Sequence, residues 1–251
     1  MEEIYNFFVE KVNSQNGIPT FFDNTVFMIL RNGDRDKEKV LSWIINSKKN
    51  RFTKFEDRIR GVNSLTNFFG GLLGGATQGT HTVFKWKGLD MFKSSFDLSI
   101  YAMLIDEIKP EIIVEYGSGN GSSAIWLSDM CITHGLKTKI ISYDINKVNL
   151  EYQNVLFKNI DLKDLELDEG EMSGKKIIIE DAHFHVGEVL SKTDIVLTSG
   201  DYLIVEDSWR KQDIISNFLK NTKTQYVVDN YYLDFFGINV TSAKNSIFKV
   251  I

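Results

Sequence analysis

The stretch Glu-Ile-Ile-Val-Glu-Tyr-Gly-Ser-Gly-Asn-Gly-Ser-Ser, residues 111–123, limits the possible folds of this chain more than any other. An apolar run ends in an acid, three glycines then alternate with small polar residues, and a helical pattern follows. This order predicts a strand, a tight turn and a helix. Glycines allow positive φ and a close approach of a ligand to the main chain, and the helix N-terminus offers unpaired N–H groups. The pattern indicates a nucleoside-cofactor site, and the alternative is a turn without a ligand.

Strand-like and helical patterns alternate after this stretch and predict an α/β fold. The sheet is expected to be Rossmann-like, seven-stranded and mostly parallel, with helices on both faces and a helical N-terminal extension. Expected strands are 111–116, 138–143, 154–159, 176–180, 201–206, 225–229 and 246–250, and expected helices are 96–108, 122–133, 146–152, 186–198 and 210–220. We predict two parts, a helical segment with a glycine-rich flap over residues 1–80 and a catalytic domain over 81–251.

The N-terminal part has two amphipathic patterns, at 1–15 and 36–48, which we expect to pack as a lid or as a homo-oligomer contact. Residues 49–66 are polar and are expected to form loop with some helix. The segment 68–80 holds five glycines among apolar residues, which favours a mobile flap over a site as much as a surface loop.

Composition and charge exclude several classes of protein. The 251 residues suffice for one α/β domain with an appended segment, and the net charge of −5 argues against a nucleic-acid binder. No apolar run approaches a membrane span, and no basic block suggests a membrane surface. The single cysteine, Cys131, and the acidic N-terminus favour a cytoplasmic protein without a signal peptide.

Two acids that follow strands favour S-adenosylmethionine over a dinucleotide. Glu115 would repel a pyrophosphate but suits the amino group of S-adenosylmethionine, and Ser122 stands where the dinucleotide fingerprint needs glycine. Asp144 ends the second strand, where an acid accepts hydrogen bonds from both ribose hydroxyls; capping of the next helix is its alternative role.

The fourth and fifth strands also end in acids, which the fold would bring to one edge of the sheet. We expect Glu180, Glu206 and Asp207 to bind Mg²⁺ or a similar divalent ion, because grouped carboxylates need a cation. His183 or His185 would then remove a proton from a substrate hydroxyl. Capping acids and surface histidines without a metal are the alternative.

Other catalytic patterns are missing from the sequence. It has no G-x-S-x-G elbow, no Walker A motif and no paired cysteine and histidine spacing for zinc. Three alternatives stay open: a binding or scaffold protein that has lost catalysis, an NAD-dependent oxidoreductase, and an enzyme that uses S-adenosylmethionine without a metal.

In motif order, residues 80–210 resemble the cephalosporin-hydroxylase-type methyltransferases, which include rhamnosyl O-methyltransferases. The matching segments are Trp86-Lys87-Gly88 with Lys93 and Asp97, the run 109–117, Gly121-Ser122-Ser123-Ala124, Glu180-Asp181-Ala182-His183, and Gly200 to Asp207 as G-x-Y-x-x-x-E-D. The resemblance implies a class I methyltransferase that transfers a methyl group from S-adenosylmethionine to a hydroxyl of a small molecule or sugar.

The resemblance also implies a magnesium ion held at Glu180, Glu206 and Asp207, with Asp207 among the catalytic residues. The family usually has Asp where Glu180 stands, so whether Glu180 or Asp181 reaches the ion is open. Residues expected to bind the cofactor are Glu115, Gly117, Ser118, Gly119, Gly121, Ser122, Asp144, Ile145, Asp161 and Asp181.

Overall fold

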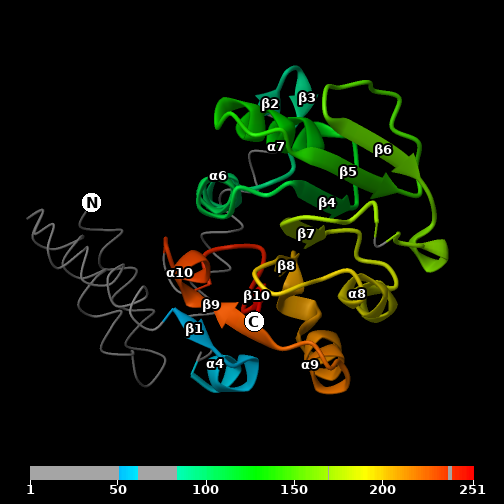
Figure 1. Cartoon of the computed structure of the whole chain (residues 1–251). Coiled ribbons are helices and arrows are strands. Elements are labelled where there is room, and N and C mark those ends of the chain that lie inside the picture. Colours follow the sequence, from blue (N-terminus) through cyan, green and yellow to red (C-terminus); the bar gives the residue numbers. More distant parts are fainter. Residues whose placement is uncertain (1–50, 62–83, 169, 237–238) are drawn as a thin grey trace, which may run out of the picture.

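The structure, a computed structural model, describes residues 51–61, 84–168, 170–236 and 239–251, where eight strands form one sheet in the order β1-β9-β10-β8-β7-β4-β5-β6 (Figure 1). These strands are β1 Phe52–Thr53, β4 Ile112–Tyr116, β5 Lys139–Asp144, β6 Val155–Asn159, β7 Lys176–Glu180, β8 Tyr202–Val205, β9 Tyr226–Asp229 and β10 Ile247–Val250. The five strands from β6 to β8 are parallel, whereas β10 runs antiparallel to β8 and β9, and β1 antiparallel to β9. The predicted mostly parallel α/β sheet is confirmed, and β1 is an addition to the seven strands expected.

Helices cover both faces of the sheet, as Figure 1 shows: α6, α7 and α10 lie on one side, and α4, α8 and α9 on the other. Their bounds are α4 Phe55–Gly61, α6 Ser95–Ile108, α7 Ser122–Thr133, α8 Val186–Asp194, α9 Gln212–Asn221 and α10 Asn230–Leu233. A small hairpin, β2 Lys85–Trp86 and β3 Leu89–Asp90, precedes α6. The helices predicted at 1–15 and 36–48 and the flap at 68–80 lie outside the described residues.

The helix expected at 146–152 is wrong. Asp144 Oδ1 accepts a hydrogen bond from the Asn146 N–H over 2.7 Å, which turns the chain as it leaves β5. Val148 and Leu150, two residues apart, both pack against Gly121, where an added Cβ would come within 3.1 Å of each. Alternate side chains that face the same neighbour belong to extended rather than helical chain. Helix α8 also ends four residues before its predicted end, because the chain continues in turns such as Val196 N–H to Thr193 O.

Residues 51–61 belong to the edge of the sheet. Arg51 donates hydrogen bonds to both carboxylate oxygens of Asp229, from Nε over 2.9 and 3.0 Å and from Nη2 over 2.7 Å, and also contacts Tyr202. Arg58, in helix α4, forms an ion pair with Asp234. The first pair fastens the start of β1 to β9, and the second fastens α4 to the end of α10. Both β1 and α4 lie in the stretch 49–66, which was expected to be loop with some helix. The division of the chain at residue 80 stays a prediction.

The strand order places a ligand site between β4 and β7. From β4 the chain proceeds outward through β5 and β6, then crosses back to β7 on the other side of β4. In open α/β sheets such a reversal leaves a crevice at the carboxyl ends of the strands. Every residue of β4 and β7 is buried, including the acids Glu115 and Glu180. A buried acid needs a partner, and these partners define the site.

Candidate functional site

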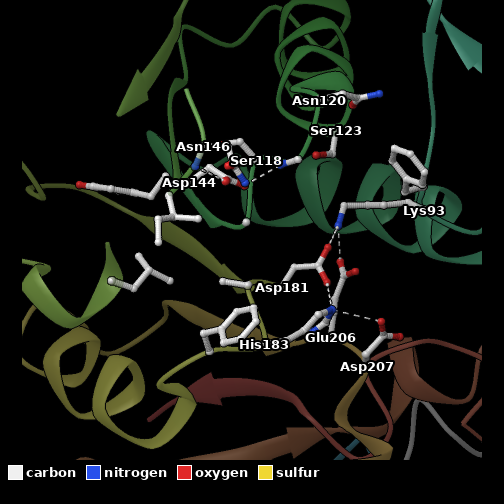
Figure 2. A pocket seen from close by; sticks show the side chains of 18 of the residues that line it. Lys93, Ser118, Asn120, Ser123, Asp144, Asn146, Asp181, His183, Glu206 and Asp207 are labelled. Atoms are coloured by element: carbon white, nitrogen blue, oxygen red, sulfur yellow. Dashed lines mark hydrogen bonds and ion pairs between the residues drawn. The ribbon is translucent and has the colours of Figure 1, made fainter. Parts of the chain in front are cut away.

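A cavity of about 560 Å³ lies at the carboxyl ends of β4, β5, β7 and β8 (Figure 2). This volume is within the range of small-molecule sites. Twelve of the predicted site residues line it: Gly117, Ser118, Gly119, Ser122, Asp144, Ile145, Asp161, Asp181, His183, His185, Glu206 and Asp207. Glu115, Gly121 and Glu180 do not.

The three glycines of the loop Gly117–Gly121, the glycine loop, have different surroundings although all have positive φ. A Cβ on Gly117 would lie 2.8 Å from the carbonyl carbon and oxygen of Asp181, so this glycine lets two loops touch. A Cβ on Gly121 would press on Val148, Leu150 and Phe157 at 3.0–3.1 Å. Nothing lies within 4 Å of a Cβ on Gly119. Gly119 is therefore where a ligand can approach the main chain.

Asp144 supports the glycine loop from the end of β5. Its Oδ2 accepts the Gly119 N–H over 2.9 Å, and Ile145 beside it is 65% exposed in the cavity wall. Asp161 lies on the same side and begins a short 3₁₀ turn. A hydrogen bond from the backbone of Lys163 lowers the pKa of Asp161. This wall combines acids with an exposed aliphatic side chain.

Glu115, expected to contact the cofactor, does not line the cavity, and its role stays a prediction. Its carboxylate is fully buried under the glycine loop and accepts hydrogen bonds from Ser123 Oγ and, over 2.6 Å, from Ser142 Oγ. Ser142 Oγ lies 2.6 Å from Ser118 Oγ. Burial raises the pKa of Glu115, and nearby Lys93 opposes that rise. Glu115 thus supports the glycine loop from inside the protein, because its side chain points from β4 into the interior.

Lys93, which precedes α6, places its ammonium among the acids of the site, as Figure 2 shows. Its Nζ lies 2.8 Å from Glu206 Oε1 and 3.0 Å from Asp181 Oδ2. The Tyr101 hydroxyl of α6 also donates to Glu206. Burial acts to lower the pKa of Lys93, but the attraction of Asp181, Glu206 and Glu115 outweighs it and raises the pKa well above its ordinary value.

Glu206 is buried beside Lys93 at the end of β8. Burial and the nearby charge of Asp181 raise the pKa of Glu206 to about 7, against the opposing effect of Lys93. Its Oε1 already accepts from the Lys93 ammonium and the Tyr101 hydroxyl. Side chains of the chain itself therefore contact this oxygen, and the metal-ligand role expected of Glu206 stays a prediction.

Glu180, the other glutamate expected to bind the metal, has partners within the chain at both of its oxygens. Its Oε2 accepts from Lys211 Nζ over 2.7 Å and its Oε1 from the His183 N–H over 3.0 Å. Lys211 Nζ also donates to the backbone oxygen of Glu206 over 2.8 Å. Glu180 therefore anchors the loop that carries His183, and its fully buried carboxylate is not part of the cavity lining.

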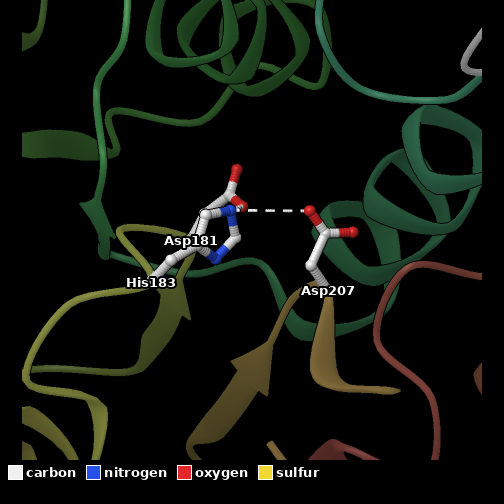
Figure 3. Close-up of side chains that lie close together, drawn as sticks. All are labelled: Asp181, His183 and Asp207. Atoms are coloured by element: carbon white, nitrogen blue, oxygen red, sulfur yellow. Dashed lines mark ion pairs between the residues drawn. The ribbon is translucent and has the colours of Figure 1, made fainter. Parts of the chain in front are cut away.

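Asp181, His183 and Asp207 form the group that we call the outer cluster (Figure 3). One donor atom of each lies within 4.8 Å of the others. His183 Nε2 is 3.6 Å from Asp181 Oδ1 and 3.5 Å from Asp207 Oδ2. His183 and Asp207 both have left-handed backbones, with φ of 64° and 44°. Such strain is common at functional sites, where the surrounding structure enforces it.

His185 is separated from the outer cluster. It precedes α8 and lies near enough to Asp161 to contribute to the lowered pKa of that acid. Of the two histidines expected to act as a base, only His183 lies beside the carboxylates of Asp181 and Asp207.

Lys93, Tyr101 and Lys211 were not expected to have roles in the site. Lys93 belongs to the segment that carries the family resemblance, but its sequence neighbours do not indicate acidic partners. Both lysines find their partners only through the fold, because each lies outside the strands that carry the acids. A local pattern could not have identified them.

A sequence model of the family "Rhamnosyl O-methyltransferase/CmcI" matches residues 78–164. Over this stretch the chain is similar to the rhamnosyl O-methyltransferase/CmcI family. The rhamnosyl O-methyltransferase of Mycobacterium leprae (strain TN) is 29% identical over 136 residues, which are 49% of this chain and 59% of that protein. The protein of the same name from Mycobacterium tuberculosis (strain ATCC 25618 / H37Rv) is 27% identical over 137 residues, 49% of this chain and 56% of that protein.

Solved structures of CmcI have a fold similar to that of this chain. A CmcI structure with Mg and SAM has a TM-score of 0.56 at 22% identity and covers 67% of this chain and 76% of its own. One with SAH has a TM-score of 0.57 at 22% identity and covers 67% and 82%. The chain spans less than two thirds of the length of the curated relatives above. Within the described ranges, no helix has both the length and the apolar character that a membrane span requires.

Proposed function

We propose that this chain is an S-adenosylmethionine-dependent O-methyltransferase that acts on a hydroxyl of a small molecule or sugar. The observation that carries the proposal is one cavity with the open side of Gly119 next to Asp144 in one wall and the outer cluster in another. Nucleoside binding and proton removal can therefore take place in the same enclosed space. The names of the relatives support a sugar acceptor. Cys131, buried and unpaired, favours the cytoplasm.

The donor would lie along the glycine loop. Asp144 has the acceptor oxygens to hold the two ribose hydroxyls, and the exposed Ile145 offers an apolar surface to the adenine. The open space at Gly119 admits the donor to the backbone. S-adenosylmethionine supplies an electrophilic methyl group on a positively charged sulfur. The chain contributes by fixing that methyl group in line with the acceptor oxygen.

The outer cluster fits a divalent cation better than the set Glu180, Glu206 and Asp207. Asp181 and Asp207 offer carboxylate oxygens to the cavity, and Mg²⁺ prefers such hard oxygen ligands. We therefore assign these two acids to the cation. A bound Mg²⁺ would lower the pKa of an acceptor hydroxyl and so prepare it for attack. CmcI has been solved with Mg and SAM, which supports this assignment.

His183 is then the general base. Its Nε2 would accept the proton of the acceptor hydroxyl as the oxygen forms its bond to the methyl carbon, and the carbon–sulfur bond breaks. The ring lies 3.6 Å from Asp181 and 3.5 Å from Asp207, which places it next to an acceptor oxygen bound to a cation on these acids. The hydrogen bond from the His183 backbone to Glu180 fixes the position of the ring's loop.

Calorimetry with S-adenosylmethionine and with NAD, followed by methyl transfer from labelled donor to a panel of rhamnosides and other hydroxyl compounds, tests the proposal. We expect binding of S-adenosylmethionine, weakening by about tenfold or more in Asp144→Ala when both ribose hydrogen bonds are lost, and product with at least one acceptor. Lys137→Ala, outside the cavity lining, serves as the control variant. Binding of NAD instead would favour an oxidoreductase, and donor binding without turnover on any acceptor would favour a scaffold protein.

A further inference from the structure

Three carboxylates surround the ammonium group of Lys93, and two of them, Glu115 and Glu206, are buried. Its Nζ lies 2.8 Å from Glu206, 3.0 Å from Asp181 and 4.0 Å from Glu115. The Lys93 side chain is only 4% exposed, yet it lies in the cavity wall. Burying several like charges is costly unless a cation compensates them. Here the chain itself provides that cation.

Lys93 also occupies the space that a metal ion would need if it bridged Asp181 and Glu206. A cation that bridges Asp181 and Glu206 must lie between their oxygens, and the Lys93 ammonium already contacts one oxygen of each. The remaining oxygen of Asp181 faces His183 in the outer cluster. Lys93 therefore divides the acids into an inner set that is already neutralised and an outer set that faces the cavity.

We infer that Lys93 is a fixed cation that takes the place of a metal ion between Asp181 and Glu206 and restricts exchangeable divalent ions to weak binding at the outer cluster. This inference deepens the proposed function and rests on it for the role of the outer cluster. Lys93 is a positioning residue in this scheme: it orients Asp181, and its charge opposes a second cation nearby. Removing that charge should raise the affinity for a divalent ion, a gain that general structural damage would not produce.

Lys211 provides a matched control. It is also a buried lysine at hydrogen-bond distance from a buried glutamate, Glu180. Neither member of that pair lines the cavity. Its removal should cost stability, as for Lys93, but should open no place for an ion in the cavity wall.

The test is the binding of Mn²⁺ alone, measured by calorimetry and electron paramagnetic resonance on the full chain. We expect Lys93→Met to bind Mn²⁺ at least about tenfold more tightly than the wild type, the size of effect that one adjacent charge has on an ionisation equilibrium. Lys211→Met should gain less Mn²⁺ affinity than Lys93→Met, because the Lys211 ammonium pairs with Glu180 and the Glu206 backbone rather than with a carboxylate that lines the cavity. A folded Lys93→Met variant that binds Mn²⁺ no more tightly overturns the inference.

A second variant covers the case in which Lys93→Met does not fold. Lys93→Met with Glu206→Gln removes the pair together, which proteins tolerate better than an unpaired buried charge. This variant should bind Mn²⁺ as the wild type does, because the outer cluster is intact; loss of binding would identify Glu206 as a ligand and overturn the inference. S-adenosylmethionine binding by the wild type is measured in parallel. Its absence would refute the proposed function, whereas normal donor binding with a failed Mn²⁺ result refutes only the role of Lys93.

Discussion

The glycine loop with Asp144 and the outer cluster form two walls of one cavity, but they are built differently. The first wall depends on backbone conformation, since its glycines have positive φ and Asp144 accepts a hydrogen bond from the Gly119 N–H. The second depends on charged side chains, whose positions are set by Lys93 and Lys211 from other parts of the chain. The first wall is therefore sensitive to the residue type at a single glycine position. The second wall is sensitive to charged pairs whose members the fold brings together.

The largest effect should follow from a change at the contact between the two walls. In Gly117→Ala the new Cβ would lie 2.8 Å from the Asp181 backbone, at a φ of 101° that alanine rarely adopts. We expect a loss of about 3 kcal/mol or more in the free energy of unfolding, together with loss of donor binding. Denaturant unfolding and calorimetry measure both. Stability equal to that of the wild type would show that the two loops do not need this contact.

Gly119→Val separates binding from stability within the first wall. No atom lies within 4 Å of the added Cβ, so the change should affect stability less than Gly117→Ala does. The branched side chain would fill the space where the donor approaches the backbone, and we expect donor affinity to fall by about a hundredfold or more. Calorimetry on the folded variant checks this result, with Gly135→Ala as a control glycine of positive φ outside the cavity. Donor binding that survives in Gly119→Val would move the donor away from this loop.

These two glycines illustrate what sequence could predict. The glycine loop, Asp144 and the seven longer strands follow from local patterns, because residue type and short-range spacing determine them. The choice between Glu180 and Asp181 could not be made in this way. Adjacent residues of extended chain point in opposite directions, so a shift of one position decides which acid enters the cavity and which meets Lys211.

The partners of the buried acids also could not be predicted from the sequence. Glu115 stands at the predicted strand end, but its side chain meets Ser123 and Ser142 rather than the cavity. Lys93 and Lys211 reach their acids from segments before β4 and after β8, and no periodicity links them. Sequence patterns therefore indicated where the acids lie along the chain, but not which side chains they contact.

The second wall should respond mainly in turnover. Asp207→Ala removes one carboxylate from the outer cluster and one neighbour of His183. We expect methyl transfer to fall about a hundredfold and dependence on added Mg²⁺ to disappear, with donor affinity near normal. Kinetics with and without EDTA, beside donor calorimetry, give the answer. A variant with full activity, or one that has lost donor binding, would contradict the separation of the two walls.

The smallest expected effect tests whether the Glu180–Lys211 pair only stabilises the fold or also positions His183. Glu180→Gln with Lys211→Met removes both charges together and so avoids an unpaired buried charge. The amide oxygen of the new side chain can still accept from the His183 N–H, so the loop is loosened rather than released. We expect kcat to fall about threefold to tenfold, as for residues that orient a reacting group through another, with donor affinity and KM for the acceptor unchanged.

A second double variant, Glu180→Ala with Lys211→Met, removes that acceptor as well and should lower kcat further, because the His183 N–H then loses its partner. Steady-state kinetics and denaturant unfolding are measured on both double variants. If the two lose stability to the same extent and keep wild-type kcat, the pair is structural only, and the position of His183 depends on its contacts with Asp181 and Asp207 alone.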